Sequence, residues 1–477
     1  MTIFVALVAV LGVLAAVAGY VITAGIRADR PATTATGARS GTAASGTPAA
    51  GTPASGTPAP TLPPAVAAAT RPPVSPATPG LGALPVAARL AAAARAALAA
   101  PALGRSVHGL VVDAATGSVL LDRSATAMAP PASTAKLATA TAVLAVLDPQ
   151  ERIATRIVAG SAPGQVVLVG GGDPTLSAAP AGRPALYPNA ARLSALAATA
   201  RRASGRPITS ILVDTSLYTG PALGPGWGAS DVPTSYGAAI QALVVDGGRP
   251  ATGGNLRSAR PALEAGRALA RLVGRPNLPV RAGRAAVGAR VLGTVYSAPL
   301  LDLVEQALLY SDNVIAEMLG RQVALAEHQP TSFAGAVVAV RMALASVGFR
   351  LPRTLVDASG LSRRDRLSAA VLAALVRLDA GSTDPALNQV VSALPVAGWE
   401  GTLAPRYRTS AVAAAGRVRA KTGTLTGVVA LAGLVRDRSG RLLVFAFIAP
   451  HVPAGGTLAA EAALDRVAAA FAACGCR

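Results

Sequence analysis

Apolar residues gather in short runs near both ends of the part of the chain that follows residue 80. The runs at 107–113 and 118–122, around a turn at 114–117, predict two strands. Further runs predict three successive strands at 418–425, 428–436 and 441–448. Apolar positions at helical spacing predict helices over 133–147, 299–309, 314–326 and 458–473, and the Ala/Val-rich stretch 338–344 is most simply core helix.

The middle of the chain has a different character. Residues 150–295 contain many Gly and Pro and several short apolar runs, such as 165–169 and 211–214, which predict strands. We therefore expect a first folded part at 81–149, an insertion domain at 150–295, and a second part of the first domain at 296–477.

The N-terminal 80 residues predict an anchor and a spacer. Residues 3–26 form an uncharged apolar run, and about 20 such residues span a bilayer as a helix. A cleavable signal peptide is the alternative, because Ala16 and Ala18 suit a cleavage site. Arg27 and Arg30 follow the run, which by the positive-inside rule conflicts with export of the rest. We still expect export, with 1–30 as membrane anchor or signal peptide and the Pro/Ala/Thr/Gly-rich residues 31–80, with a GTPA repeat, as a disordered linker.

Composition excludes several classes of protein. Hydrophobic residues make up 52% of the 477 residues, too many for a wholly disordered chain. Aromatic residues make up 3%, too few for a base-stacking surface, so no nucleic-acid partner is expected. The net charge of +20 fits either a solvated surface or affinity for anionic wall polymers or lipid headgroups.

The cysteines and histidines give no sign of a metal or cofactor. Cys474 and Cys476 are the only cysteines, which excludes a disulfide-rich scaffold. A bridge between them would be strained, and a free or intermolecular pair is the alternative. The three histidines, His108, His328 and His451, are isolated and lack ligand spacing, so neither a metal site nor a cofactor is expected.

Lysine is almost absent from this basic chain. Of the 43 basic residues only Lys136 and Lys421 are lysines. Lysine can lose its proton when it is desolvated, whereas arginine effectively cannot. The two lysines therefore point to places where a titratable amine is required, although chance survival is an alternative.

Lys136 follows Ser133 by three residues at the start of a predicted helix. This spacing places both side chains on one face of the helix, about one turn apart. A serine hydroxyl becomes a nucleophile when a nearby base takes its proton, and a neutral lysine is such a base once desolvation or another cation lowers its pKa. Taken alone, a Ser-x-x-Lys spacing also arises by chance.

Two further motifs are weak when each is taken alone. Ser311-Asp312-Asn313 could relay a proton and hold a peptide carbonyl, but these residue types also suit a helix cap. Lys421-Thr422-Gly423-Thr424 begins a run of apolar strands, where the lysine could bind a carboxylate and Gly423 would admit a substrate to the backbone. The alternative is a strand end with an incidental lysine.

Together, the three motifs resemble those of penicillin-binding proteins and class A β-lactamases, which carry S-x-x-K, S-D-N and K-T-G in this order. The long insertion after the first motif is similar to the DacB-like, penicillin-binding protein 4-like family of D-alanyl-D-alanine carboxypeptidases/endopeptidases (peptidase family S13). Further matching stretches lie at 131–140, 169–176, 357–363 and 394–403. The resemblance covers roughly residues 85–475.

The resemblance implies an α/β fold: a β-lactamase/transpeptidase-like domain, with a five-stranded antiparallel sheet flanked by helices, and a large mixed α/β insertion. It implies a serine-type, penicillin-sensitive D-Ala-D-Ala carboxypeptidase, with DD-endopeptidase activity open. Peptidoglycan stem peptides would be the substrates, β-lactams the inhibitors, and the cell envelope the location. A serine β-lactamase, with Glu317 or Glu400 as the nearby acidic residues, and a non-catalytic peptidoglycan-binding protein are the alternatives.

The resemblance also implies roles for single residues. Ser133 would form the acyl-enzyme and Lys136 would take its proton. Ser311 would relay a proton to the leaving amine, and Asn313 would hold the substrate amide. Lys421 would supply positive potential and, with Thr422 and Thr424, contact the terminal carboxylate. The N–H groups of Ser133 and Thr424 would form the oxyanion hole. The peptide would pair along the strand that contains Gly423.

Overall fold

The structure is a computed structural model and describes residues 82–228, 230–250 and 254–476. The expected anchor and linker, 1–30 and 31–80, lie outside the described residues. Within the described residues, no helix has both the length and the apolar character that a membrane crossing requires.

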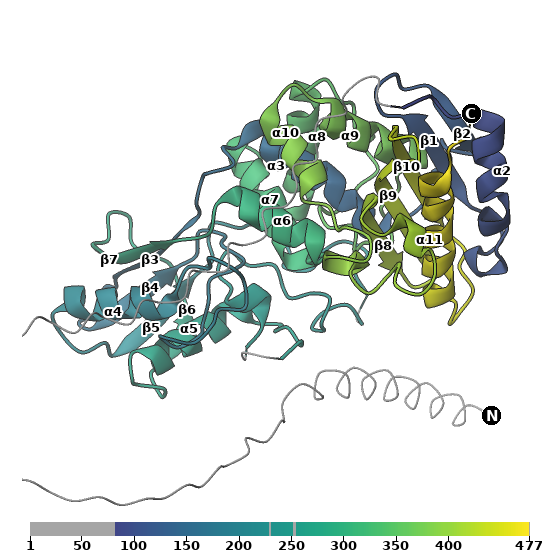
Figure 1. Cartoon of the computed structure of the whole chain (residues 1–477). Helices are drawn as coiled ribbons and strands as arrows, with labels where there is room; N and C mark the ends of the chain where they lie inside the picture. Colours follow the sequence, from purple (N-terminus) through teal and green to yellow (C-terminus); the bar gives the residue numbers. More distant parts are fainter. Residues whose placement is uncertain (1–81, 229, 251–253, 477) are drawn as a thin grey trace, which may run out of the picture. The chain divides into compact units, whose positions relative to one another are not determined.

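A five-stranded antiparallel sheet joins the two ends of the described chain (Figure 1). Its strand order is β2-β1-β10-β9-β8, so that two early strands pair beside three late ones. The sheet confirms the predicted antiparallel arrangement. The observed strand ends differ from the predicted ones by no more than a residue or two, because the pattern of apolar residues does not show where strand pairing stops. The strands are β1 (His108–Asp113), β2 (Val119–Arg123), β8 (Val418–Leu425), β9 (Val428–Arg436) and β10 (Leu442–Ala449).

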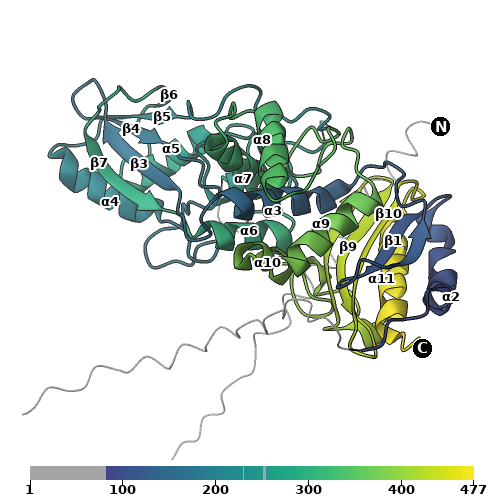
Figure 2. The same ribbon diagram turned by 90° about the horizontal axis from the view of Figure 1, so that it is seen from above.

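Side chains alternate between the two faces of this sheet, and helices bury both faces. Val111 and Phe445 contribute to a core with α2 (Ala87–Leu98) and α11 (Thr457–Ala473). Val112 and Val444 belong to a second core that includes α9 (Ala369–Gly381). Figure 2 shows the sheet between α9 on one side and α2 and α11 on the other.

The second core extends into a cluster of helices around α3 (Lys136–Val146), most of which is buried. A short 3₁₀ helix, η2 (Ala132–Ala135), leads directly into α3. Both α7 and α8 contact α3. The cluster also contains α6 (Leu300–Leu309), α7 (Asn313–Ala326), α8 (Phe333–Ser346) and α10 (Pro385–Ser392).

A separate mixed sheet forms from the segment between the first two motifs. Its order is β6-β5-β4-β3-β7, with β4, β5 and β6 parallel and the other pairs antiparallel. The helices α4 (Leu193–Ser204) and α5 (Pro261–Leu272) share an apolar core with it. The strands of this sheet are β3 (Ala154–Ala159), β4 (Gln165–Val169), β5 (Ser210–Asp214), β6 (Val280–Ala282) and β7 (Val291–Tyr296).

Elsewhere in the described chain, the remaining 3₁₀ helices are η1 (Pro101–Leu103), η3 (Asp246–Gly248), η4 (Gly401–Leu403) and η5 (Val412–Ala414).

The C-terminal end of the described chain is tied back to its start. The Val86 amide donates to the Cys476 carbonyl at 2.7 Å. Cys474 and Cys476 are bonded to each other, with Cα atoms 5.0 Å apart. Of the sequence alternatives, the structure therefore has the local bridge.

Candidate active site

Ser133 and Lys136 lie at the junction of η2 and α3. The Lys136 Nζ is 3.0 Å from the Ser133 Oγ, 2.5 Å from the Asn313 Oδ1 and 2.7 Å from the Ser359 carbonyl oxygen. The lysine side chain is buried, whereas Ser133 is half-buried and lines a cleft. The predicted Ser-Lys pair is therefore in direct contact.

The partners of Lys136 fix the direction of its lone pair when the amine is neutral. A carbonyl oxygen and the amide oxygen of Asn313 only accept hydrogen bonds, so both take an N–H from the amine. A neutral amine has two hydrogens, and its lone pair is then left to face the Ser133 hydroxyl. Burial lowers the pKa of Lys136 to about 8, although the charges of Asp357, Asp312 and Glu317 oppose the shift. The Lys136 amine can therefore be neutral near neutral pH, with its lone pair directed at the Ser133 hydroxyl.

The Ser311-Asp312-Asn313 turn forms the start of α7, and its three side chains have separate tasks. Asp312 is the N-cap, and its Oδ1 accepts from the N–H groups of Val314 and Ile315 at 2.9 and 3.2 Å. Ser311 has a φ of 57°, in the left-handed region, and accepts at 2.9 Å from the Lys421 Nζ. Asp312 is therefore the helix cap, whereas Ser311 and Asn313 contact Lys421 and Lys136.

Residues of the segment between the first two motifs hold this turn from the other side. The second oxygen of Asp312 accepts from the Arg257 guanidinium at 2.7 Å and from the Tyr187 hydroxyl at 2.9 Å. The Tyr236 carbonyl accepts at 3.1 Å from the Asn313 Nδ2. Burial opposes ionisation of Asp312, but the charge and hydrogen bond of Arg257, the Arg249 charge and the Ile315 amide together outweigh it and lower the pKa of Asp312 to about 2. Sequence reasoning missed these contacts because no local pattern marks Arg257, Tyr187 or Tyr236.

Lys421 is the second buried amine of the site. Its Nζ donates to the Ser311 Oγ and, at 2.9 Å, to the Thr422 carbonyl. Burial lowers its pKa well below the usual range, and the charges of Lys136 and Arg406 lower it further. Gly423 lies against the Pro131 carbonyl oxygen, which would be 2.8 Å from a Cβ at that position. The strand that carries Lys421 therefore packs closely against the turn that carries Ser133.

β8 is an edge strand, and its outer edge is covered only at its start. The Ala397 amide donates to the Val418 carbonyl, and the Ala420 amide donates to the Pro395 carbonyl, each at 3.0 Å. Backbone groups of an antiparallel strand alternate between its two edges with a period of two. The amides of Thr422 and Thr424 consequently face this same outer edge, beyond the covering segment, where an added peptide strand can pair.

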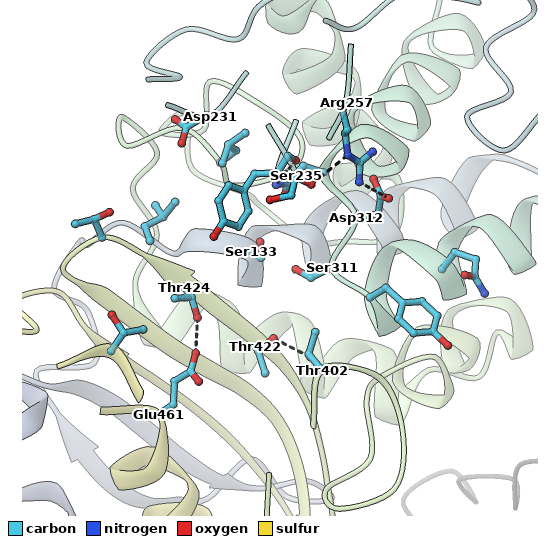
Figure 3. Close-up of a pocket in the computed structure, with 18 of the residues that line it drawn as sticks. Ser133, Asp231, Ser235, Arg257, Ser311, Asp312, Thr402, Thr422, Thr424 and Glu461 are labelled. Carbon is cyan, nitrogen blue, oxygen red and sulfur yellow. Dashed lines mark hydrogen bonds and ion pairs between the residues drawn. The ribbon is translucent and has the colours of Figure 1, made fainter. Parts of the chain in front are cut away.

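The cleft has a volume of about 900 Å³ and brings together residues from all three motifs. Ser133, Ser311 and Asn313 line it together with Thr422 and Thr424. Figure 3 shows Ser133 and Ser311 facing the same space, with Thr424 and Thr422 along the neighbouring strand. The Thr422 hydroxyl is 2.9 Å from that of Thr402, and the Thr424 hydroxyl donates to Glu461 at 2.8 Å. Sequence reasoning missed Thr402 and Glu461.

A buried acidic group supports the lysine from behind. The Glu317 carboxylate accepts from the amides of Ala358 and Ser359 at 3.0 and 2.9 Å, and Ser359 in turn presents its carbonyl to Lys136. Burial and the Asp357 charge raise the pKa of Glu317 to about 7, while the Arg321 guanidinium opposes the shift. Glu317 is fully buried and holds backbone, so it does not face the cleft as a deacylation base would.

Gly360 explains why this loop can approach Ser133. It has a φ of +75°, and a Cβ there would overlap the Ala132 carbonyl oxygen, next to Ser133. The Asp357 carboxylate accepts from the Gly360 amide at 2.7 Å and from the Trp227 indole at 2.7 Å. Within the described residues, no group of three or more His, Cys, Asp or Glu side chains is arranged to hold a metal ion.

Comparisons with known proteins agree with the geometry. The model of the D-Ala-D-Ala carboxypeptidase 3 (S13) family matches residues 90–253 and 250–471. A carboxypeptidase of Mycobacterium tuberculosis is 43% identical over 86% of this chain and 90% of its own length. Carboxypeptidase DacB of Mycolicibacterium smegmatis is 45% identical over 81% of this chain and 84% of its own. The crystal structure of penicillin binding protein 4 (dacB) from Haemophilus influenzae matches this chain with a TM-score of 0.64 at 20% sequence identity. The match covers 76% of this chain and 95% of that protein, which shows a shared fold.

Proposed function

The chain belongs to the D-Ala-D-Ala carboxypeptidase 3 (S13) family, and we propose that it hydrolyses the terminal D-Ala-D-Ala bond of peptidoglycan stem peptides through an acyl-enzyme on Ser133. The observation that carries the proposal is the buried Lys136 amine, 3.0 Å from the Ser133 Oγ, with two obligate acceptors taking its other hydrogens. This arrangement supports a general base that works without histidine.

Acylation begins when the Ser133 oxygen attacks the carbonyl carbon of the penultimate D-Ala. The hydroxyl proton passes to Lys136 as the new C–O bond forms. The N–H groups of Ser133 and Thr424 stabilise the oxyanion, a contribution of about 3 kcal/mol for each donor. The outward direction of the Thr424 amide on the open edge of β8 supports this role.

The C–N bond breaks when the leaving amine receives a proton. The Ser311 Oγ lines the cleft and lies 2.9 Å from the Lys421 Nζ. The Ser311 hydroxyl therefore gives its proton to the leaving nitrogen, and the proton that Lys136 took from Ser133 replaces it. Asn313 positions the peptide and Lys136 at once. Water then attacks the ester carbon, and the Ser133 oxygen leaves with a proton, which restores the free enzyme.

β-Lactams present a reactive amide to the same nucleophile, and we propose that they acylate Ser133 and inhibit the enzyme. Because its substrates would be peptidoglycan stem peptides, we propose that the enzyme acts in the cell envelope. A second reaction, cleavage of D-Ala cross-links between stem peptides, uses the same chemistry on a bulkier leaving group. Ser133 is half-buried and lines a cleft of about 900 Å³, which leaves room for part of such a substrate.

Labelling by a fluorescent penicillin tests the nucleophile. Ser133→Ala removes labelling and D-alanine release, while Ser161→Ala, in an exposed loop outside the cleft, leaves both unchanged. Labelling that persists in Ser133→Ala contradicts the proposal. Mass spectrometry of defined muropeptides then distinguishes D-alanine release from cross-link cleavage, and either product excludes a protein that only binds peptidoglycan. Rapid turnover of a chromogenic cephalosporin would instead identify a β-lactamase.

A further inference from the structure

Two fully buried carboxyl groups, those of Asp357 and Asp365, lie in the loop between α8 and α9. The same loop contains Ser359, whose carbonyl oxygen accepts from the Lys136 Nζ at 2.7 Å. The carboxyl groups of Asp357 and Asp365 are in hydrogen-bonding contact with each other. Neither of them lines the cleft, so the pair acts on the reaction through its charge and through the position of the loop.

The hydrogen-bond donors around the two carboxyl groups are unequally divided. Asp357 accepts from the amides of Gly360 and Ser362, each at 2.7 Å, and also from an indole N–H. Asp365 accepts at 2.7 Å from the amide of Val356 through its Oδ1. Its Oδ2 is buried, and within the described residues no N–H or O–H group of the neutral or cationic side chains or of the backbone donates to it.

This division determines where a proton shared by the pair resides. Two ionised carboxylates in contact repel each other and cannot form a hydrogen bond, because both only accept. A single proton makes one of them a donor. The charge belongs on Asp357, where several N–H groups stabilise it, and the proton belongs on Asp365, which lacks such donors. Burial, followed by the charge and hydrogen bond of Asp357, also raises the pKa of Asp365 far above its ordinary range.

The other charged groups near the pair agree with this assignment. Glu317 of α7, which is paired with an arginine of the same helix, is a further negative group that disfavours a charge on Asp365. The Arg366 guanidinium donates at 2.8 Å to the backbone carbonyl of Asp365. On the side of α3, the charge of Asp357 opposes the burial that lowers the pKa of Lys136.

We propose that Asp365 is a positioning residue, which stays protonated in the folded protein and donates its proton to Asp357. This hydrogen bond holds the loop so that the Ser359 carbonyl accepts from Lys136, and it leaves one negative charge behind the base instead of two. The inference rests on the proposed acyl transfer at Ser133, in which Lys136 takes the proton. Asp365 itself does not touch the substrate.

The rate of acylation by a penicillin, measured between pH 6 and 9, tests the role of this proton. Asp365→Ala removes the donor, and we expect acylation at pH 7 to slow about three- to tenfold, because the loop is no longer held. Asp365→Asn offers an N–H that cannot be lost, so we expect it to restore the wild-type rate. Since asparagine replaces a neutral acid, the inflection of the pH profile should stay where it is in the wild-type protein.

Glu317→Gln is the matched comparison for the charge. It removes a negative group from behind the same lysine, and the inflection should therefore move to lower pH. An inflection that moves by the same amount in Asp365→Asn means that Asp365 is ionised, which overturns the inference. Acylation by Asp365→Ala at the wild-type rate overturns it as well, because the loop then needs no donor at this position.

Where Asp365→Ala does not fold, denaturant unfolding of Asp365→Asn decides. The wild-type protein takes up a proton at Asp365 when it folds above the ordinary pKa of an aspartate, and the variant does not. The stability of Asp365→Asn relative to the wild-type protein should therefore increase between pH 4 and 8. A difference that is independent of pH overturns the inference. Absence of penicillin labelling in the wild-type protein overturns the proposed function instead, and the unfolding measurement still tests the proton on Asp365.

Discussion

The ion pair between Arg257 and Asp312 gives the sharpest test of how the segment between the first two motifs supports the site. Arg257→Gln removes the cation from a pair whose side chains are 4% and 6% exposed. The pKa of Asp312 falls from 3.8 to about 2 in the folded protein, and this difference of roughly 2 units is worth about 2.5 kcal/mol. Breaking a buried pair from one side costs about 3–5 kcal/mol. We therefore expect the free energy of unfolding at pH 7 to fall by about 3 kcal/mol.

The same substitution has a defined dependence on pH. In the wild-type protein the depressed pKa of Asp312 contributes stability above its ordinary pKa of 3.8, and this is lost as the pH falls through about 2. Without Arg257, burial raises that pKa, so the variant loses stability as the pH rises through the new value. The difference between the two proteins is therefore largest near neutral pH, and it shrinks as the pH falls from the raised pKa of the variant to about 2.

Denaturant unfolding between pH 3 and 7, with the rate of penicillin acylation measured in parallel, provides the assay. Because Asp312 lies between Ser311 and Asn313, we expect acylation to slow by about ten- to a hundredfold. Arg267→Gln, which breaks an exposed pair with Glu264, is the matched control and changes stability by less than about 1 kcal/mol. The reasoning is refuted where Arg257→Gln behaves like this control in both measurements.

A second substitution separates the loss of charge balance from the loss of contact. Asp312→Asn keeps a side-chain oxygen for the amides of Val314 and Ile315 and removes the buried charge. In the Arg257→Gln background it should recover part of the lost stability, because no uncompensated carboxylate remains. A double variant less stable than Arg257→Gln would show that charge is not the cause.

Three further predictions concern the machinery around Ser133. The acylation rate should rise about tenfold from pH 7 to pH 9, since the pKa of Lys136 is about 8 and the neutral amine is the base; a flat profile contradicts this role. Glu317→Gln should move the inflection to lower pH, because the Glu317 charge raises the pKa of Lys136, and an unmoved or higher inflection would exclude that influence. Gly360→Ala should lower the free energy of unfolding by more than about 2 kcal/mol, because the φ of Gly360 is +75° and a Cβ there would meet the Ala132 carbonyl. The control is Gly381→Ala, where a Cβ meets open space. Equal losses of stability in the two variants would refute the argument.

The sequence predicts those parts of the fold that depend on neighbours in the chain. The strands Val418–Leu425 and Val428–Arg436 agree with the apolar runs to the residue, and α7 begins one residue before its predicted start, because capping residues and apolar periodicity are local signals. The mixed sheet was expected only in outline. The order of its strands depends on crossovers, which no run of residues encodes.

The same division applies to the site. Ser133, Lys136 and the other motif residues are recognisable because their spacing reflects a helix or a strand. Arg257, Tyr236 and Glu461 contact the motifs only after the chain has folded, and around each the sequence resembles ordinary surface. The scarcity of lysine was the exception, since a composition count located both amines of the site without any spatial information.

That scarcity has a practical consequence for chemical modification. The 477-residue chain has two ε-amines, at Lys136 and Lys421, and both side chains are at most 1% exposed. Amine-directed crosslinkers and acylating dyes therefore find no lysine on the native surface. Incorporation of such a reagent at either position reports that the protein has opened, so isotope-tagged acetylation read by mass spectrometry can follow its unfolding without an added probe.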